Sequence, residues 1–308
     1  MVNTINYSFI IPHKNAPELL RRCVDSIPRR KDIQIIVVDD DSKPEIVDWD
    51  SFDWGDKTCI ELFRTHGLHS AGAVRNEGLK YAKGKWLMFA DCDDFYLEGF
   101  LDTLDQYKDS DLDALYYNIR CVDGKSFEPS DVYAKTQQMI GEYEANPHLW
   151  EHIRYLKPPW TKMVSKSFVD KYHIQFEDVI LGNDVWYSYQ IGYWAKKTKV
   201  VNNEIYVYTI NSNSITFHRT VAKDVAQIET YVKQNAFFDF IGHPEWHINL
   251  PGWIKYHWLK SHHKFKYTCA LLANAWRIYK VRNKYVEGIR QSEIAVQSPA
   301  GVQESSKC

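Results

Sequence analysis

The stretch from Lys85 to Asp94 constrains this chain most, because an apolar run of strand length ends there in three aspartates. Clustered carboxylates repel one another and are costly to desolvate, so they favour a site that holds a cation. Oxygen ligands at the end of a buried strand suit a hard divalent metal such as Mg²⁺ or Mn²⁺, which in turn suits a phosphate group. A second interpretation stays open, in which Asp94 caps a following helix on a solvated acidic turn.

Two earlier apolar runs, 7–11 and 33–38, predict buried strands, and residues between them have the spacing of an amphipathic helix. We expect Asn15 to be the N-cap of that helix, with Glu18 three residues later. Apolar strands joined by a helix are typical of a parallel sheet covered on both faces. The second strand also ends in acid, at 39–41, so two clusters of carboxylates are predicted at the carboxyl edge where such sheets bind ligands.

Further helices and strands are predicted along the chain. A helix is predicted to begin near Ser70 and to end by Gly84, and the stretch 121–148 is predicted to be a long loop or a small hairpin. Further strands are expected at 59–63, 85–90 and 114–119.

Composition limits the class of protein. A net charge of −2 in 308 residues argues against a polyanion binder that works by bulk electrostatics. The six cysteines show no paired spacing, the first residues lack a signal pattern, and no apolar run approaches the ~20 residues of a membrane span. These features favour a cytoplasmic protein with reduced thiols, either soluble or attached peripherally to the inner face of the cell membrane.

Taken in order, the segments resemble glycosyltransferase family 2, whose members are inverting enzymes of the GT-A type. The similarity is carried by Ser8–Asn15 (the opening strand and loop), Ile36–Ser42 (V-D-D-G-S, with Asp41 where the family usually has Gly), Ala73–Gly78 (A-R-N-x-G) and Phe89–Asp94 (D-x-D-D).

Three later segments extend the resemblance to about residue 216. They are Pro159–Lys162 (W-x-K), Phe176–Val185 (F-x-E-x-x-x-x-E-D-V) and the closing Tyr206–Ser214. The alignment places Asn183 and Asp184 on the family's E-D pair, whereas Glu177 and Asp178 lie too close to Phe176 to take that place.

The resemblance implies an α/β, Rossmann-like GT-A fold, with a mixed, mostly parallel sheet flanked by helices and a helical C-terminal extension. Residues 1–216 would form the catalytic domain, divided into a nucleotide-sugar half (1–119) and an acceptor half (120–216). It also implies metal-dependent transfer of a sugar from a UDP-sugar to a hydroxyl of a saccharide acceptor, lipid-linked or polymeric, as in bacterial surface-polysaccharide assembly.

The resemblance also assigns roles to residues. Asp93 and Asp91 would hold Mn²⁺ or Mg²⁺, and Asp40 would accept a hydrogen bond from the uracil imide. Arg75 would supply a cation near the base or phosphates, although an ion pair with a nearby acid is an equally open interpretation. The predicted nucleotide-sugar contacts are Pro12, Asn15, Asp40, Arg75, Asn76 and Asp91.

Asp184 is the candidate general base that takes the proton of the acceptor hydroxyl. It could equally be a helix N-cap, because an apolar helical run begins at Val185. The predicted acceptor contacts are Trp160, Lys162, Asn183 and Trp186, and for the two tryptophans a core position is an open alternative.

The C-terminal third has its own pattern. Residues 246–286 contain no Asp or Glu, and within 250–284 basic residues alternate with aromatic and aliphatic ones. We expect a helical region over 217–290 that contacts an anionic membrane surface, with packing on the catalytic domain or on a second subunit, as in a homodimer, as the alternative. No nucleic-acid motif is present, and residues 291–308 are expected to be disordered.

The sequence also bears on other classes of function. The departures at Asn183 and Asp41 fit a catalytically inactive subunit that binds a nucleotide sugar or acts as a scaffold. A dehydrogenase is disfavoured because no G-x-G-x-x-G follows the first strand, and a phosphoryl-transfer enzyme because no phosphate-cradling loop is found.

Overall fold

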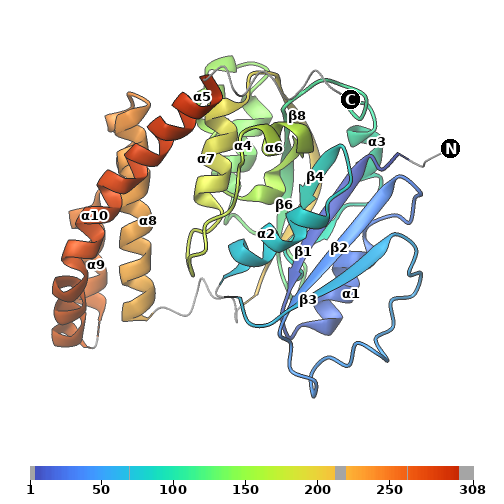
Figure 1. Ribbon diagram of the computed structural model, residues 1–308, viewed down its shortest axis with the longest axis horizontal. Helices are drawn as coiled ribbons and strands as arrows, with labels where there is room; N and C mark the ends of the chain where they lie inside the picture. Colours follow the sequence, from blue (N-terminus) through green and yellow to red (C-terminus); the bar gives the residue numbers. More distant parts are fainter. Residues whose placement is uncertain (1–3, 69, 212–219, 262, 298–308) are drawn as a thin grey trace. The chain divides into compact units, whose positions relative to one another are not determined.

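The structure is a computed structural model that describes residues 4–68, 70–211, 220–261 and 263–297, which fall into two compact units (Figure 1). Unit 1 contains the chain up to Val179 together with Asn183–Ser214. Unit 2 contains Ile180–Gly182 and the chain from Ile215 onward.

Unit 1 is built on a mixed sheet, as predicted. The described strands lie in the order β3-β2-β1-β4-β7-β6-β8-β5, and the pairs β3–β2, β2–β1, β1–β4 and β6–β8 are parallel. Because β1 lies between β2 and β4, the carboxyl ends of these three strands meet at one edge of the sheet, where the acid clusters were expected. The strands are β1 (Tyr7–His13), β2 (Ile33–Asp40), β3 (Ile60–Thr65), β4 (Trp86–Phe89), β5 (Phe95–Tyr96), β6 (Ala114–Asp123), β7 (Lys162–Ser165) and β8 (Thr198–Ile210).

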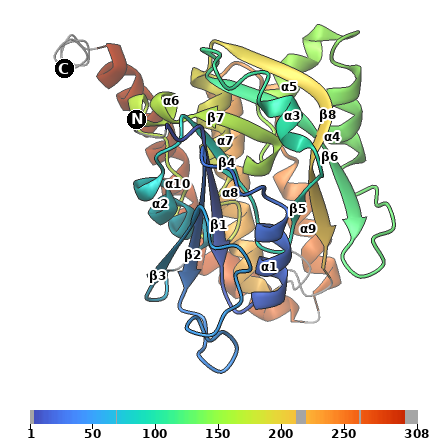
Figure 2. The ribbon, with the colours of Figure 1, turned by 90° about the vertical axis from the view of Figure 1, so that its right-hand side faces the viewer.

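Helices cover both faces of this sheet (Figures 1 and 2). Alternate residues of β1 enter different cores: Phe9 and Ile11 pack with α1 and α3, whereas Ile10 packs with α2, α6 and α7. Burial on both faces explains why the central strands are apolar throughout. The helices of unit 1 are α1 (Pro17–Asp25), α2 (Ala71–Tyr81), α3 (Phe100–Leu104), α4 (Ala134–Glu142), α5 (Trp150–Ile153), α6 (Lys166–Lys171) and α7 (Val185–Trp194), with short 3-10 turns at Pro147–Leu149 and Pro159–Thr161.

The start of α1 differs from the prediction. The helix begins at Pro17, and Asn15 has a φ of 53°, which is outside the helix. Its side-chain oxygen accepts from the backbone N–H of Lys43 at 2.8 Å, and its own N–H donates to the Ser42 hydroxyl at 2.8 Å. Asn15 therefore joins the loop after β1 to the loop after β2 and does not cap the helix.

The stretch 121–148 is also more ordered than a loop or hairpin. Strand β6 continues to Asp123, and α4 follows at Ala134–Glu142. Helix α4 buries only Thr136 and Ile140, which explains its weak periodicity in the sequence. By contrast, the predicted start of α2 is confirmed, because the Ser70 hydroxyl accepts from the backbone N–H of Ala73.

Unit 2 is helical, with α8 (Val221–Phe240), α9 (Leu250–Lys260) and α10 (Lys264–Gln297), and a 3-10 turn at Pro244–Trp246 lies between α8 and α9. Helix α10 packs against α8. It continues to Gln297, into the segment that was expected to be disordered, and residues 298–308 lie outside the described part. None of the described helices combines the length and apolar character that crossing a bilayer requires.

Candidate active site

The first element of the site is a buried pair at the ends of β1 and β2. His13 and Asp39 face each other in the strand register, and Nδ1 of His13 lies 2.9 Å from the Asp39 carboxylate. The backbone N–H of Ala16 donates to Nε2 of His13, so the ring proton is on Nδ1 and donates to Asp39. Although burial opposes ionisation, hydrogen bonds from His13 and Ser42 hold the pKa of Asp39 below its usual value. Asp39 thus holds together the ends of β1 and β2 at this edge of the sheet.

Asp40 and Asp41 behave differently from Asp39. One oxygen of Asp40 accepts from the backbone N–H of Leu68 at 2.6 Å and from the Thr65 hydroxyl at 2.9 Å, and the other lies 3.4 Å from the Lys14 ammonium. Asp41 has a φ of 58°, in the left-handed region that glycine prefers and that aspartate tolerates better than most residues. The replacement of the family's glycine by Asp41 is therefore compatible with the same turn.

The three acids after β4 have distinct surroundings. Asp94 is fully buried, and its carboxylate accepts from the Tyr206 hydroxyl at 2.8 Å and the Thr209 backbone N–H at 2.7 Å. Burial, followed by the charges of Asp93 and Asp91, raises its pKa well above the usual value. Because α3 begins only at Phe100, Asp94 does not cap it. Asp94 instead ties the acid cluster to β8.

Strand β8 also supports the two other acids. The backbone N–H of Asp91 donates to the Tyr206 hydroxyl, and the side-chain amide of Asn211 donates to the Asp93 carboxylate at 3.0 Å. The Thr209 hydroxyl donates to the backbone carbonyl of Asp93. Burial and the negative charge of Asp91 raise the pKa of Asp93. The sequence located this closing segment by its Y-x-Y pattern but gave no signal for Thr209 or Asn211.

Arg75 connects the acid cluster to the start of α7. Its guanidinium donates to the side-chain oxygen of Asn183 at 3.0 Å and forms an ion pair with Asp91. It also lies 5.4 Å from the ring centre of Phe176 and is only 5% exposed. A Cβ at Gly72 would collide with the Glu177 carbonyl and lie 2.8 Å from Cβ of Asn183, so the glycine allows α2 to approach this segment closely.

Asp184 immediately precedes α7 and makes no side-chain capping bond. Asp184 therefore occupies the N-cap position, but its carboxylate does not cap the helix. Burial raises the pKa of Asp184, and the charge of Arg75 opposes that shift. A half-buried carboxylate with a raised pKa, beside the residue that binds Arg75, is suited to accept a proton.

Two predicted ligand contacts, Asn76 and Trp160, have structural roles. Both polar atoms of the Asn76 side chain bind the backbone of Phe176, at 2.9 Å each. Trp160 is 3% exposed, and its ring stacks with the rings of Tyr206 and Tyr208. Neither side chain is therefore placed for the predicted ligand contact, since its binding surface is already used.

Lys162 is completely buried. Its ammonium donates to the carbonyls of Leu156 and Pro158 and to the Ser188 hydroxyl, at 2.7 to 3.0 Å. Burial lowers its pKa to about 7, and the charge of Asp184 opposes that shift. The predicted acceptor contact of Lys162 is thus replaced by a role in holding the loop before β7 against α7.

Two acids after β4, Asp91 and Asp93, offer oxygen ligands of the kind that a divalent metal takes. Within the described ranges no group of three or more His, Cys, Asp or Glu side chains is arranged to hold a metal ion. Asp91 and Asp93 nevertheless repel each other at a partly buried position. Two carboxylates suit Mg²⁺ or Mn²⁺ when phosphate oxygens complete the coordination.

A comparison with known families decides the class of protein. Residues 8–172 match the family model described as glycosyl transferase family 2. The chain belongs to this family. As a member of it, the protein is a glycosyltransferase, and its sheet and flanking helices are those of the GT-A fold.

Similar proteins agree with the family assignment. The chain is 25% identical over 238 residues to the glycosyltransferase GlyG of Streptococcus pneumoniae, covering 72% of this chain and 77% of GlyG. Its fold is similar to Staphylococcus aureus TarS 1–349 in complex with UDP-GlcNAc (TM-score 0.56, 17% identity, 74% of this chain and 66% of that one). It is also similar to the mannosyltransferase PcManGT of Pyrobaculum calidifontis in complex with GDP-Man and Mn²⁺ (TM-score 0.55, 15% identity, 88% and 75%).

The support from β8 leads to a stability prediction. Tyr206→Phe removes the hydroxyl that donates to buried Asp94, and we expect it to lower the free energy of unfolding by about 1–3 kcal/mol. Tyr208→Phe is the matched control, because within the described residues the structure shows no hydrogen bond for that hydroxyl, and it should change stability by less than about 0.5 kcal/mol. Urea denaturation measures both, and equal effects would contradict the assigned role of Tyr206.

Proposed function

We propose that this glycosyltransferase is a metal-dependent inverting enzyme that transfers a sugar from a UDP-sugar to a hydroxyl of a saccharide acceptor. The observation that carries the proposal is the bridge formed by Arg75. It brings Asp91, in the acid cluster after β4, to the segment that holds Asn183 and Asp184. Arg75 would then contact both the diphosphate site, through Asp91, and the segment that carries the proton acceptor, through Asn183.

The donor would lie along the carboxyl edge of β1, β2 and β4. Asp40, whose second oxygen lies 3.4 Å from the ammonium of the exposed Lys14, would accept from the uracil imide, and Pro12 and Asn15 would line the same pocket. TarS was solved with UDP-GlcNAc, which supports a nucleotide sugar as donor. Arg75 would exchange part of its contact with Asp91 for the donor phosphates, as a planar fork donor can.

Asp93 and Asp91 would hold Mn²⁺ or Mg²⁺. When bound, the cation would stabilise the negative charge of the departing nucleoside diphosphate. The structure of PcManGT with GDP-Man and Mn²⁺ supports a divalent metal in this fold. Asn211 fixes the orientation of Asp93 by donating to one carboxylate oxygen.

Asp184 would take the proton from the acceptor hydroxyl while that oxygen attacks the anomeric carbon from the side opposite the diphosphate. A single displacement inverts the configuration, so an α-linked donor gives a β-linked product. The raised pKa of Asp184 brings it closer to the pH at which a base works well. Trp186, in the first turn of α7, remains the candidate acceptor contact.

We propose that the acceptor is a lipid-linked or polymeric saccharide of a bacterial surface polysaccharide, and that the enzyme acts in the cytoplasm. The alternative of an inactive scaffold rested on Asn183 and Asp41. Both departures are accommodated, because Asn183 binds Arg75 and Asp41 adopts the left-handed turn. The aspartate needed as base is present at 184.

The role of Asp184 predicts a loss of turnover without a loss of donor binding. Asp184→Asn should lower kcat by roughly 10²–10⁴-fold and leave the affinity for UDP unchanged. Because the pKa of Asp184 is raised in the folded state, its charged form costs stability at neutral pH, so the same variant should also unfold at a higher temperature. In the unaltered enzyme, activity should fall as pH decreases through that raised pKa.

The matched control is Asp178→Asn, which alters the nearby E-D pair and whose exposed carboxylate accepts only from the Ser70 hydroxyl among the bonds described. It should retain turnover. A wild type that is inactive against every UDP-sugar, yet still binds UDP, would favour the inactive-subunit alternative.

The incomplete metal site predicts that metal and nucleotide bind together. Mn²⁺ alone should bind weakly, and UDP should increase its affinity by about tenfold or more, because phosphate oxygens supply the missing ligands. Isothermal titration calorimetry measures this gain. Asp93→Asn should abolish it and the exposed Asp109→Asn should not, and a gain that survives in Asp93→Asn would refute the metal assignment.

A further inference from the structure

Unit 2 carries an exposed apolar stripe along α10. Phe265, Leu272, Trp276 and Tyr279 are 84%, 72%, 66% and 58% exposed. At 3.6 residues per turn their spacing places all four within about 60° of arc on one side of the helix. Large apolar side chains that gather on one exposed face mark an interaction surface, whereas single exposed residues do not.

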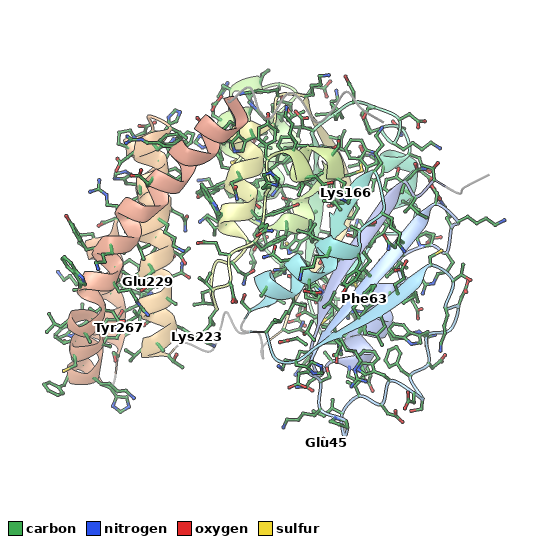
Figure 3. All side chains as sticks on the ribbon, in the orientation of Figure 1. Glu45, Phe63, Lys166, Lys223, Glu229 and Tyr267 are labelled. Atoms are coloured by element: carbon green, nitrogen blue, oxygen red, sulfur yellow. The ribbon has the colours of Figure 1, made fainter. Side chains whose placement is uncertain are left out.

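The same helix uses another face for packing within unit 2. Tyr267 is 1% exposed, and Arg277 forms an ion pair with Glu229 of α8 at 2.6 Å (Figure 3 labels Tyr267 and Glu229). The packing of α10 on α8 therefore leaves the stripe uncovered. Helix α9 also carries two exposed apolar side chains, Tyr256 and Leu259, which are 52% and 55% exposed. We call the four residues Phe265, Leu272, Trp276 and Tyr279 the aromatic face.

Lysines lie beside the rings of these helices. The ammonium of Lys260 is 4.5 Å from the ring centre of Tyr256, and that of Lys280 is 5.2 Å from the ring centre of Trp276. Lys264 lies 5.2 Å from the ring centre of Trp258 in the same way. Within the described residues these three lysines form no ion pair. Stems that follow apolar side chains while the charges stay at the edge are typical of side chains at a membrane interface.

We propose that the aromatic face binds an anionic lipid surface, with α9 and α10 lying in the plane of the interface. The inference goes beyond the proposed reaction and does not depend on it. Apolar side chains would enter the boundary between headgroups and acyl chains, and the flanking lysines would contact lipid phosphates.

The charge pattern favours lipid over a second copy of the chain as the occupant. A symmetric pair of these faces would bring lysines against lysines, since residues 246–286 contain no acid to receive them. An anionic bilayer supplies both the apolar phase and the negative charge that the face lacks.

The test uses the full chain and vesicle flotation. The protein should float with vesicles of phosphatidylcholine mixed with phosphatidylglycerol, and about tenfold more weakly with phosphatidylcholine alone. Leu272→Ser combined with Trp276→Ser should abolish flotation, and Lys260→Gln or Lys280→Gln should weaken it by up to about fivefold each and reduce its salt dependence.

The matched control is Ile46→Ser combined with Val132→Ser, which removes exposed apolar side chains of unit 1 and should leave flotation unchanged. Circular dichroism and thermal melting verify that each variant is folded. Failure of the unaltered protein to float with the anionic vesicles would overturn the proposal. If the protein does not bind vesicles but forms dimers, and Leu272→Ser combined with Trp276→Ser dissociates them, the aromatic face binds a second copy of the chain instead.

The outcome is separable from that of the proposed function. Vesicle binding without UDP binding would leave the lipid surface standing and refute the donor assignment. UDP binding without vesicle binding would refute the lipid surface and leave the donor assignment standing.

Discussion

The contact of Arg75 with Asp91 and Asn183 is the interaction on which the site depends. A buried guanidinium is costly unless it is paired, and here it pairs with an acid that would otherwise add to the repulsion around Asp93. The same side chain joins α2, the turn after β4 and the start of α7. Gly72 makes this possible, because any side chain there would push α2 away from Asn183.

Around that contact the acids divide their roles by burial. In each cluster one carboxylate is used by the fold: Asp39 at the end of β2 binds His13, and Asp94 after β4 binds β8. The neighbouring acids are less tightly held. Asn211 donates to one oxygen of Asp93, and the second oxygen of Asp40 lies 3.4 Å from the exposed Lys14. Structural acids of this kind fix the backbone on which the others are presented, so the site is organised before a ligand arrives.

The sequence predicted the fold well and the individual roles less well. Continuous apolar runs identified β1, β2 and β4, and clustered acids identified the edge where they meet. Asn15 was mistaken for a cap because its positive φ depends on bonds to residues 42 and 43, which only the fold brings near. The contact of Asn211 with Asp93 likewise joins residues 118 positions apart, which local pattern does not show.

Motif letters did not distinguish ligand contacts from structural ones. Lys162 and Asn76 fit the family pattern, yet the fold uses their polar atoms for backbone carbonyls and for Phe176. The central claim, a single displacement assisted by Asp184, is tested most directly by the anomer formed first. Proton NMR of an α-linked UDP-sugar hydrolysed slowly by the enzyme with Mn²⁺ should show the β-anomer of the free sugar before mutarotation. Appearance of the α-anomer first would contradict the account.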